Sequence, residues 1–74
     1  MQEIAIHTEY IQLNQLIKLA GWVENGSEAN ACIEEGLVQV NGQTELRKRN
    51  KIYPGMQVSI ESEDLALTVL AELK

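Results

Sequence analysis

The chain has 74 residues, of which 45% are hydrophobic and 23% charged, and its formal net charge is −5 at pH 7. These values favour one folded domain over residues 1–74 and argue against a disordered chain. A single cysteine, Cys32, excludes an internal disulfide and a cysteine-rich metal site, and we expect no metal or cofactor. Because the sequence has neither a signal peptide nor an apolar run near the ~20 residues of a membrane span, we expect a cytoplasmic chain without membrane contact.

Two short helices are predicted in the first half of the chain. Residues 2–6 alternate only partly, which fits either a strand or an ordered arm. A first helix, ended by Gly21, is predicted by apolar residues at i, i+3, i+4 and i+7: Leu13, Leu16, Ile17 and Ala20. A second helix, with Ser27 as its expected N-cap, has the same spacing: Ala29, Cys32, Ile33 and Gly36. The short connection between them predicts a helical hairpin.

A β-hairpin is predicted around Asn41-Gly42, a pair of residues that favours tight turns between strands. A two-residue loop would set Val40 opposite Gln43. A three-residue loop would instead set Val40 opposite Thr44 and Val38 opposite Leu46, which keeps the apolar residues on one face. We therefore expect the three-residue loop.

Two further strands complete the expected sheet. Proline and glycine in residues 53–56 predict a type II turn, and the alternation that follows it predicts a strand through Met56, Val58 and Ile60. Period-two alternation favours a closing strand over residues 65–73, although the same residues could form a short helix: Leu65, Leu67, Val69, Ala71 and Leu73. The expected fold class is α+β, with a two-helix hairpin packed on a small antiparallel sheet.

Positive charge is concentrated in one run, Arg47-Lys48-Arg49-Asn50-Lys51, which holds four of the six basic residues. The chain carries −5 and this run carries +4, so all other residues together carry −9. A positive patch on an acidic protein is suited to a polyanion, and nucleic acid is the first candidate. The alternative is a solvated loop whose charge is balanced by Glu61, Glu63 and Asp64.

Five segments resemble, in order and spacing, the RNA-binding domain of the ribosomal protein S-four type, also called the alpha-L motif, and above all its small stand-alone bacterial members. They are residues 11–21 (IQLNQLIKLAG), 26–30 (GSEAN), 35–42 (EGLVQVNG), 45–52 (ELRKRNKI) and 54–58 (PGMQV). The resemblance covers roughly residues 10–61. It implies a two-helix unit on a small sheet that binds structured RNA, such as ribosomal or transfer RNA, where the second helix meets the hairpin.

The resemblance also implies which residues contact RNA. The matching positions on that surface or its rim are Lys18, Ser27, Asn41, Arg47, Lys48, Arg49 and Lys51. Arginine forks suit directional phosphate contacts, and lysines suit point-charge contacts. If residues 47–49 continue a strand, Lys48 lies on the face opposite the two arginines.

Each candidate also has a plainer structural reading. Asn41 makes a turn, Ser27 caps a helix and Lys18 is an exposed helix lysine. Among the aromatic residues, Tyr53 is the preferred stacking partner for a base, ahead of Tyr10 and Trp22, because it adjoins the basic run.

The second helix departs from the family pattern, because Asn30 stands where a basic residue is usual and Glu28, Glu34 and Glu35 lie nearby. This favours a rival hypothesis, an adaptor that has lost RNA binding and docks a basic protein partner. No phosphate loop, nucleophile elbow or catalytic spacing is present, so we do not expect an enzyme. Oligomeric state is not fixed by the sequence, and a monomer is the expectation.

Overall fold

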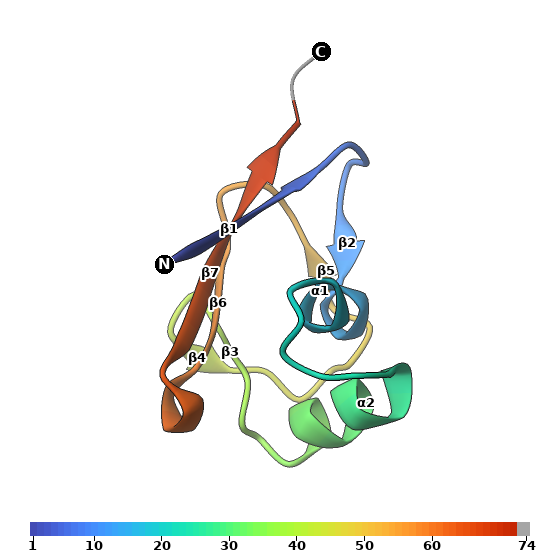
Figure 1. The fold of residues 1–74 in the computed structure, drawn as a ribbon, viewed down its shortest axis with the longest axis vertical. Coiled ribbons are helices and arrows are strands. Elements are labelled where there is room, and N and C mark those ends of the chain that lie inside the picture. Colours follow the sequence, from blue (N-terminus) through green and yellow to red (C-terminus); the bar gives the residue numbers. More distant parts are fainter. Residues whose placement is uncertain (73–74) are drawn as a thin grey trace.

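The computed structural model describes residues 1–72, which form a helical layer on one side and a sheet on the other (Figure 1). The expected α+β class is confirmed: a helical hairpin packs on a sheet that is antiparallel as expected except for one parallel pair of strands. The elements in chain order are β1 (Gln2–Ile6), β2 (Ile11–Gln12), α1 (Leu13–Leu19), α2 (Gly26–Glu34), β3 (Gln39–Val40), β4 (Gln43–Thr44), β5 (Lys51–Ile52), β6 (Gln57–Ile60), the short 3₁₀ helix η1 (Glu61–Glu63) and β7 (Leu65–Ala71).

Helix α1 forms where the apolar spacing predicts it. Leu13, Leu16 and Ile17 are fully buried, and Gly21 follows the helix with a φ of 81°, in the left-handed region that favours glycine. The Trp22 amide donates to the Ile17 carbonyl at 3.1 Å, which turns the chain back toward α2. The predicted helical hairpin is therefore confirmed.

Helix α2 begins two residues earlier than expected, and the prediction of Ser27 as its N-cap is wrong. Asn25 is the N-cap, and its side-chain oxygen accepts from the Glu28 amide at 2.9 Å. The Glu28 carboxylate in turn accepts from the Glu24 amide at 3.3 Å. Asparagine caps as well as serine does, and the Glu28 carboxylate satisfies the amide of the residue before the cap, Glu24. Ser27 is exposed in the first turn.

The hairpin prediction is also wrong in its register. Val40 pairs with Gln43, so the loop has two residues, Asn41 and Gly42, with φ values of 51° and 84°. Two successive left-handed residues make the tight turn that matches strand twist, and Asn-Gly is the preferred pair for it. Both residues of β4 are exposed, so no apolar face required the longer loop.

The five-stranded sheet has the order β1-β7-β6-β3-β4. The predicted closing strand is confirmed as β7, while its last predicted residue, Leu73, lies outside the described residues. Strand β1 pairs with β7 in parallel, with Ile4 opposite Val69, so the first and last strands lie side by side (Figure 1). The other pairs in this sheet are antiparallel.

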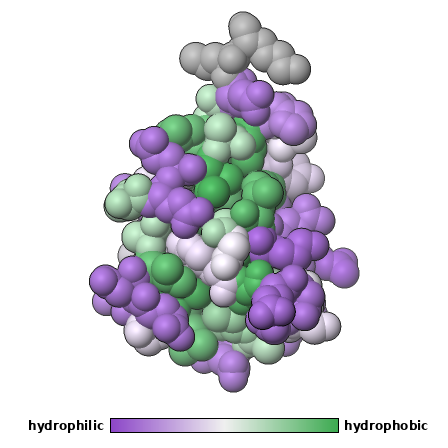
Figure 2. All heavy atoms as spheres, viewed as in Figure 1, coloured by the Kyte–Doolittle hydropathy of each residue, from purple (hydrophilic) through white to green (hydrophobic). Residues whose placement is uncertain are grey.

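The core lies between the helices and the sheet. Its members come from both layers: Ile6, Leu13, Leu16, Ile17, Ala29, Ile33, Val38, Ile52, Val58, Ile60, Leu67 and Val69. Figure 2 shows that apolar side chains also reach the surface between hydrophilic ones on the face drawn there. No helix within residues 1–72 is both long and apolar enough to span a membrane.

Candidate nucleic-acid interface

The basic run, which we call the basic turn (residues 47–51), begins with a tight turn and not with a strand. The Asn50 amide donates to the Arg47 carbonyl at 3.1 Å, which places Lys48 and Arg49 at the centre of the turn. The alternation expected of a strand therefore does not apply to residues 47–49. Their side chains extend from a turn.

Main-chain bonds fasten the basic turn to the start of α1. The amides of Leu13 and Asn14 donate to the carbonyls of Asn50 and Lys48, both at 2.9 Å. No side chain among residues 1–72 caps helix α1, so these carbonyls satisfy amides that would otherwise lack a partner. Because the attachment uses only the backbone of the turn, it does not occupy the cationic side chains.

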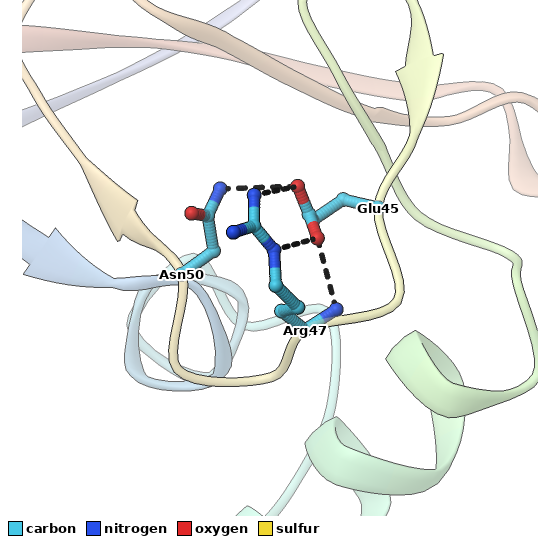
Figure 3. Close-up of polar contacts among 3 residues, drawn as sticks. All are labelled: Glu45, Arg47 and Asn50. Atoms are coloured by element: carbon cyan, nitrogen blue, oxygen red, sulfur yellow. Dashed lines mark hydrogen bonds and ion pairs between the residues drawn. The ribbon is translucent and has the colours of Figure 1, made fainter.

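Glu45 organises the turn from the side of the hairpin (Figure 3). One carboxylate oxygen accepts from Arg47 Nε at 2.9 Å and from the Arg47 amide at 3.0 Å. The other accepts from Arg47 Nη2 at 3.2 Å and from Asn50 Nδ2 at 3.3 Å. The Glu45 side chain is 15% exposed and that of Arg47 is 76% exposed. The pair thus holds the guanidinium in a fixed plane, and three of its five N–H groups remain for a ligand.

The Glu45–Arg47 pair stays ionised at neutral pH. The hydrogen bond from the Arg47 side chain, followed by that from its amide, holds the pKa of Glu45 below its ordinary value. The hydrogen bond to Glu45 raises the pKa of Arg47 further above its already high ordinary value. The turn therefore presents a permanent cation whose direction is set by a permanent anion.

A second carboxylate, Glu34 of α2, lies 3.4 Å from Lys48 Nζ. Within residues 1–72, neither Arg49 nor Lys51 takes part in an ion pair. The four cations and two carboxylates leave this region with a charge of +2. The alternative reading named Glu61, Glu63 and Asp64 as the balancing carboxylates, but within residues 1–72 the basic turn pairs with Glu34 and Glu45. Exposed ion pairs of this kind contribute only about 0–1 kcal/mol, so a phosphate can displace Glu34.

Two tyrosines adjoin the basic turn on a second, two-stranded sheet that the sequence did not predict. Strands β2 and β5 are antiparallel, with Ile11 opposite Ile52, and the next position in this register sets Tyr10 opposite Tyr53. The two ring centroids are 5.7 Å apart and the rings are tilted by 48°. Lys51 Nζ lies 4.9 Å from the centroid of the Tyr10 ring. Cation and aromatic groups thus share one small surface.

Four of the predicted site residues line one hollow of about 520 Å³ beside the hairpin: Asn41, Arg47, Lys51 and Tyr53. Asn41 has a structural role there as well. Its side-chain oxygen accepts from the Gln57 amide at 2.9 Å, and its own amide donates to the Gln57 carbonyl at 2.8 Å. Lys48 and Arg49 stand on the turn next to this hollow.

The structure does not bring the other two predicted residues into this hollow. Ser27 is exposed at the start of α2. Lys18 is exposed in the last turn of α1, where it lines a separate hollow with Ile11 and Gln15. Those two residues also line the hollow that contains Tyr10, so the surface runs continuously from Lys18 to the tyrosine pair.

Asn30 does not replace the usual basic residue as a free contact. Its side-chain oxygen accepts from Asn14 Nδ2 at 3.1 Å and so joins α2 to α1. Asn14 Oδ1 is buried without a hydrogen-bond partner among the described residues. The side chain at this position therefore holds the two helices together.

Sequence reasoning missed Glu45 and gave Tyr10 too little weight. A carboxylate two residues before an arginine is too common to stand out. The signal for Tyr10 was the pairing of β2 with β5, two-residue strands too short to produce a periodicity.

Comparisons with known proteins agree with this architecture. A family model described as the S4 domain matches residues 4–68. The chain is 48% identical over 50 residues to the Escherichia coli (strain K12) protein named "Putative RNA-binding protein YbcJ", a match that covers 68% of this chain and 71% of that protein. It is 40% identical over 58 residues to the Bacillus subtilis (strain 168) protein named "Probable ribosome maturation protein RlbA", covering 78% and 82%.

A solved structure extends the match to nearly the whole chain. The solution structure of YbcJ from E. coli, described as revealing an alpha-L motif involved in RNA binding, matches with a TM-score of 0.73 and 38% identity. The match covers 96% of this chain and 89% of that one. Sequence, fold and family model therefore agree that this chain belongs to the S4 domain family and carries the alpha-L motif.

Proposed function

We propose that this chain is a cytoplasmic, non-enzymatic module that binds structured RNA, ribosomal or transfer RNA, through the basic turn. The observation that carries this proposal is the placement of four cationic side chains on a tight turn and the strand residue that follows it, in a chain whose net charge is −5. The names of the relatives support it, since one refers to RNA binding and another to ribosome maturation.

The cations of the basic turn would take different parts in binding. Arg47, held in plane by Glu45, offers its three remaining N–H groups to one phosphate. Arg49 and Lys51, which form no ion pair within residues 1–72, reach the backbone without first giving one up. Lys48 exchanges Glu34 for a phosphate. These are contacts to phosphate, so RNA is recognised by its shape and backbone more than by its bases.

Affinity should depend strongly on salt. The region has a charge of +2 when both carboxylates stay in place and +4 when they are displaced. Neutralising two to four phosphates gives a slope of about −1.5 to −3.5 in a plot of log affinity against log salt concentration. Such a module is a weak, salt-sensitive binder, as expected for a chain that is acidic elsewhere.

The test is a fluorescence-anisotropy titration of a labelled RNA hairpin and of bulk transfer RNA over a salt series. The variant is Arg49→Glu, because Arg49 is exposed and forms no ion pair within residues 1–72. We expect affinity to fall at least about ten-fold at low salt and the slope to become shallower by about one unit.

A control variant separates the site from net charge. Ala31→Glu with Ala71→Glu makes the same change in net charge at two exposed positions outside the basic turn, and we expect a much smaller loss of affinity. Lys18→Glu, measured separately, decides whether the rim of the interface reaches Lys18. Absence of binding by the wild-type chain at low salt would overturn the proposal.

The adaptor remains a second candidate because one observation favours it. A hollow of about 470 Å³ between α2 and η1 has an apolar lining that includes Trp22 and Leu65, and Glu28, Glu35 and Glu63 also line it. Carboxylates around an apolar hollow suit a basic segment with one apolar side chain. Binding of a lysine-rich peptide that contains one leucine, lost in Glu35→Lys with Glu63→Lys, is the result expected for this candidate.

A further inference from the structure

We infer that the outer face of the β2–β5 ribbon is a stacking subsite for one unpaired nucleobase, with Tyr53 as the platform and Tyr10 and Lys51 supporting it. The inference rests on the proposed function and narrows its ligand. The RNA bound would be one with a bulge, a loop or a strand junction, and a continuous duplex would bind less well.

The ribbon has one face in the core and one toward solvent. Ile52 is fully buried, and Ile11, opposite it, packs against the core. Because side chains alternate along a strand, Tyr10, Lys51 and Tyr53 share the other face. Tyr53, the residue directly after β5, is 40% exposed.

The arrangement of the rings leaves Tyr53 available for stacking. The ring centroids are 5.7 Å apart and the rings are tilted by 48°, so the two rings are not stacked face to face. Lys51 Nζ lies 4.9 Å from the centroid of the Tyr10 ring, so the cation contacts the face of Tyr10 and not that of Tyr53. Of the two tyrosines, Tyr53 lines the hollow beside the basic turn.

Cationic side chains that could bind phosphate border the same hollow. Arg47 and Lys51 line it together with Tyr53, so a base stacked on Tyr53 would keep its own or the adjacent phosphate near these cations. Gln43, from β4, also lines the hollow and offers an amide to a base edge. Glu45 lies there too, but hydrogen bonds from Arg47 and Asn50 engage both of its oxygens.

This combination discriminates between kinds of RNA. Phosphate contacts alone bind a duplex and a bulged hairpin about equally, because both have the same backbone charge. A ring can stack only on a base that has left the helix, and every base has a face that can stack. The subsite would therefore favour an unpaired nucleotide without reading its identity.

The test compares two hairpins of equal length, one fully paired and one with a single bulged 2-aminopurine, whose fluorescence falls when it stacks. We expect the wild-type chain to bind the bulged hairpin about ten-fold more tightly and to lower the 2-aminopurine fluorescence. Tyr53→Leu should bind both hairpins with the affinity of the paired one. Tyr53→Phe, which keeps the ring, should retain the preference.

The outcomes separate this inference from the proposed function. Equal, salt-dependent affinity of the wild-type chain for both hairpins, with unchanged fluorescence, would overturn the stacking subsite and leave RNA binding intact. A preference that persists in Tyr53→Leu, folded by circular dichroism, would also overturn it. Absence of binding to either hairpin at low salt would overturn both proposals.

Discussion

At the scale of single residues, Glu45 has the largest influence on the candidate interface. From the sequence, an acidic side chain beside a basic run is expected only to reduce the local positive charge. In the fold, its carboxylate accepts four hydrogen bonds from the basic turn and fixes the plane of the Arg47 guanidinium (Figure 3). Within residues 1–72, Glu34 forms one ion pair, to Lys48, and its side chain is more exposed than that of Glu45. The two carboxylates therefore differ in function.

Glu45→Gln should lower the free energy of unfolding by about 1 kcal/mol, because an amide cannot accept all four hydrogen bonds. The loss stays this small because the Arg47 side chain is solvated. Glu34→Gln, the matched control, should lower it by at most a few tenths of a kcal/mol, as expected for one exposed contact. Urea unfolding of both variants measures the difference. Equal effects in the two variants would show that Glu45 does not organise the turn.

The contribution of Glu45 to the free energy of unfolding should fall as the pH falls. Its pKa in the folded chain lies below the ordinary value of 4.5, so the folded state favours the ionised form. The stabilisation is therefore fully present above the ordinary pKa and is lost as pH falls through the lowered folded value. The difference in unfolding free energy between wild type and Glu45→Gln should be constant near neutral pH and shrink under acid conditions. A difference that grows on acidification would contradict this sign.

Cys32, on α2, tests separately whether the packing around this helix shields its side chains. Burial, then the charges of Glu35 and Glu63, raises the pKa of its thiol above the ordinary value of 9.0. Less thiolate at a given pH means slower alkylation. Iodoacetamide should therefore modify Cys32 more slowly in the folded chain than in urea. The pH at which the alkylation rate increases should also be higher for the folded chain than for the unfolded chain. Equal rates would show that α2 and η1 do not shield the thiol.

At the scale of elements, local pattern predicted both helices, and a side-chain cap decided where α2 begins. The apolar spacing of α1 and α2 and the glycine after each helix are local signals, and both helices form as predicted. The start of α2 depended on a choice between two adequate caps, Asn25 and Ser27. The hairpin depended on turn geometry more than on the apolar face, since β4 is exposed.

Asn25→Ala should lower the free energy of unfolding by about 1 kcal/mol, because the Glu28 amide loses its acceptor. Ser27→Ala should have little effect, since Ser27 is an exposed residue of the first turn. Thermal or urea unfolding compares the two. A larger effect of Ser27→Ala would return the N-cap to Ser27 and contradict the observed helix start.

At the scale of the whole molecule, pairing between distant segments builds both the sheet and the candidate site. Strand β1 joins β7 in parallel, and this brings Ile6 into the core at 5% exposure. Pairing of β2 with β5 brings Tyr10 to Tyr53, and the backbone of the basic turn closes on α1. The interface is thus assembled from three regions of the chain.

Ile6→Ala should lower the free energy of unfolding by about 2–4 kcal/mol, because it removes buried methyl groups from a small core. Leu46→Ala is the control, since Leu46 is 57% exposed, and its effect should stay within about 0.5 kcal/mol. Denaturant unfolding of both variants tests whether β1 is an integral strand. A near-neutral Ile6→Ala would show that β1 contributes little to the core.

Local sequence signals were sufficient to predict the two helices, the glycines that end them, the turn at residues 53–56 and the concentration of positive charge at residues 47–51. Each of these depends on residues a few positions apart, so spacing and turn chemistry suffice. The tertiary structure alone decided that β1 runs parallel to β7, that Tyr10 meets Tyr53, and that Glu45 and Glu34 are the carboxylates of the basic turn. Those contacts depend on which short strands pair and on how the helices pack against the sheet, and strands of two residues have no periodicity from which pairing could be predicted.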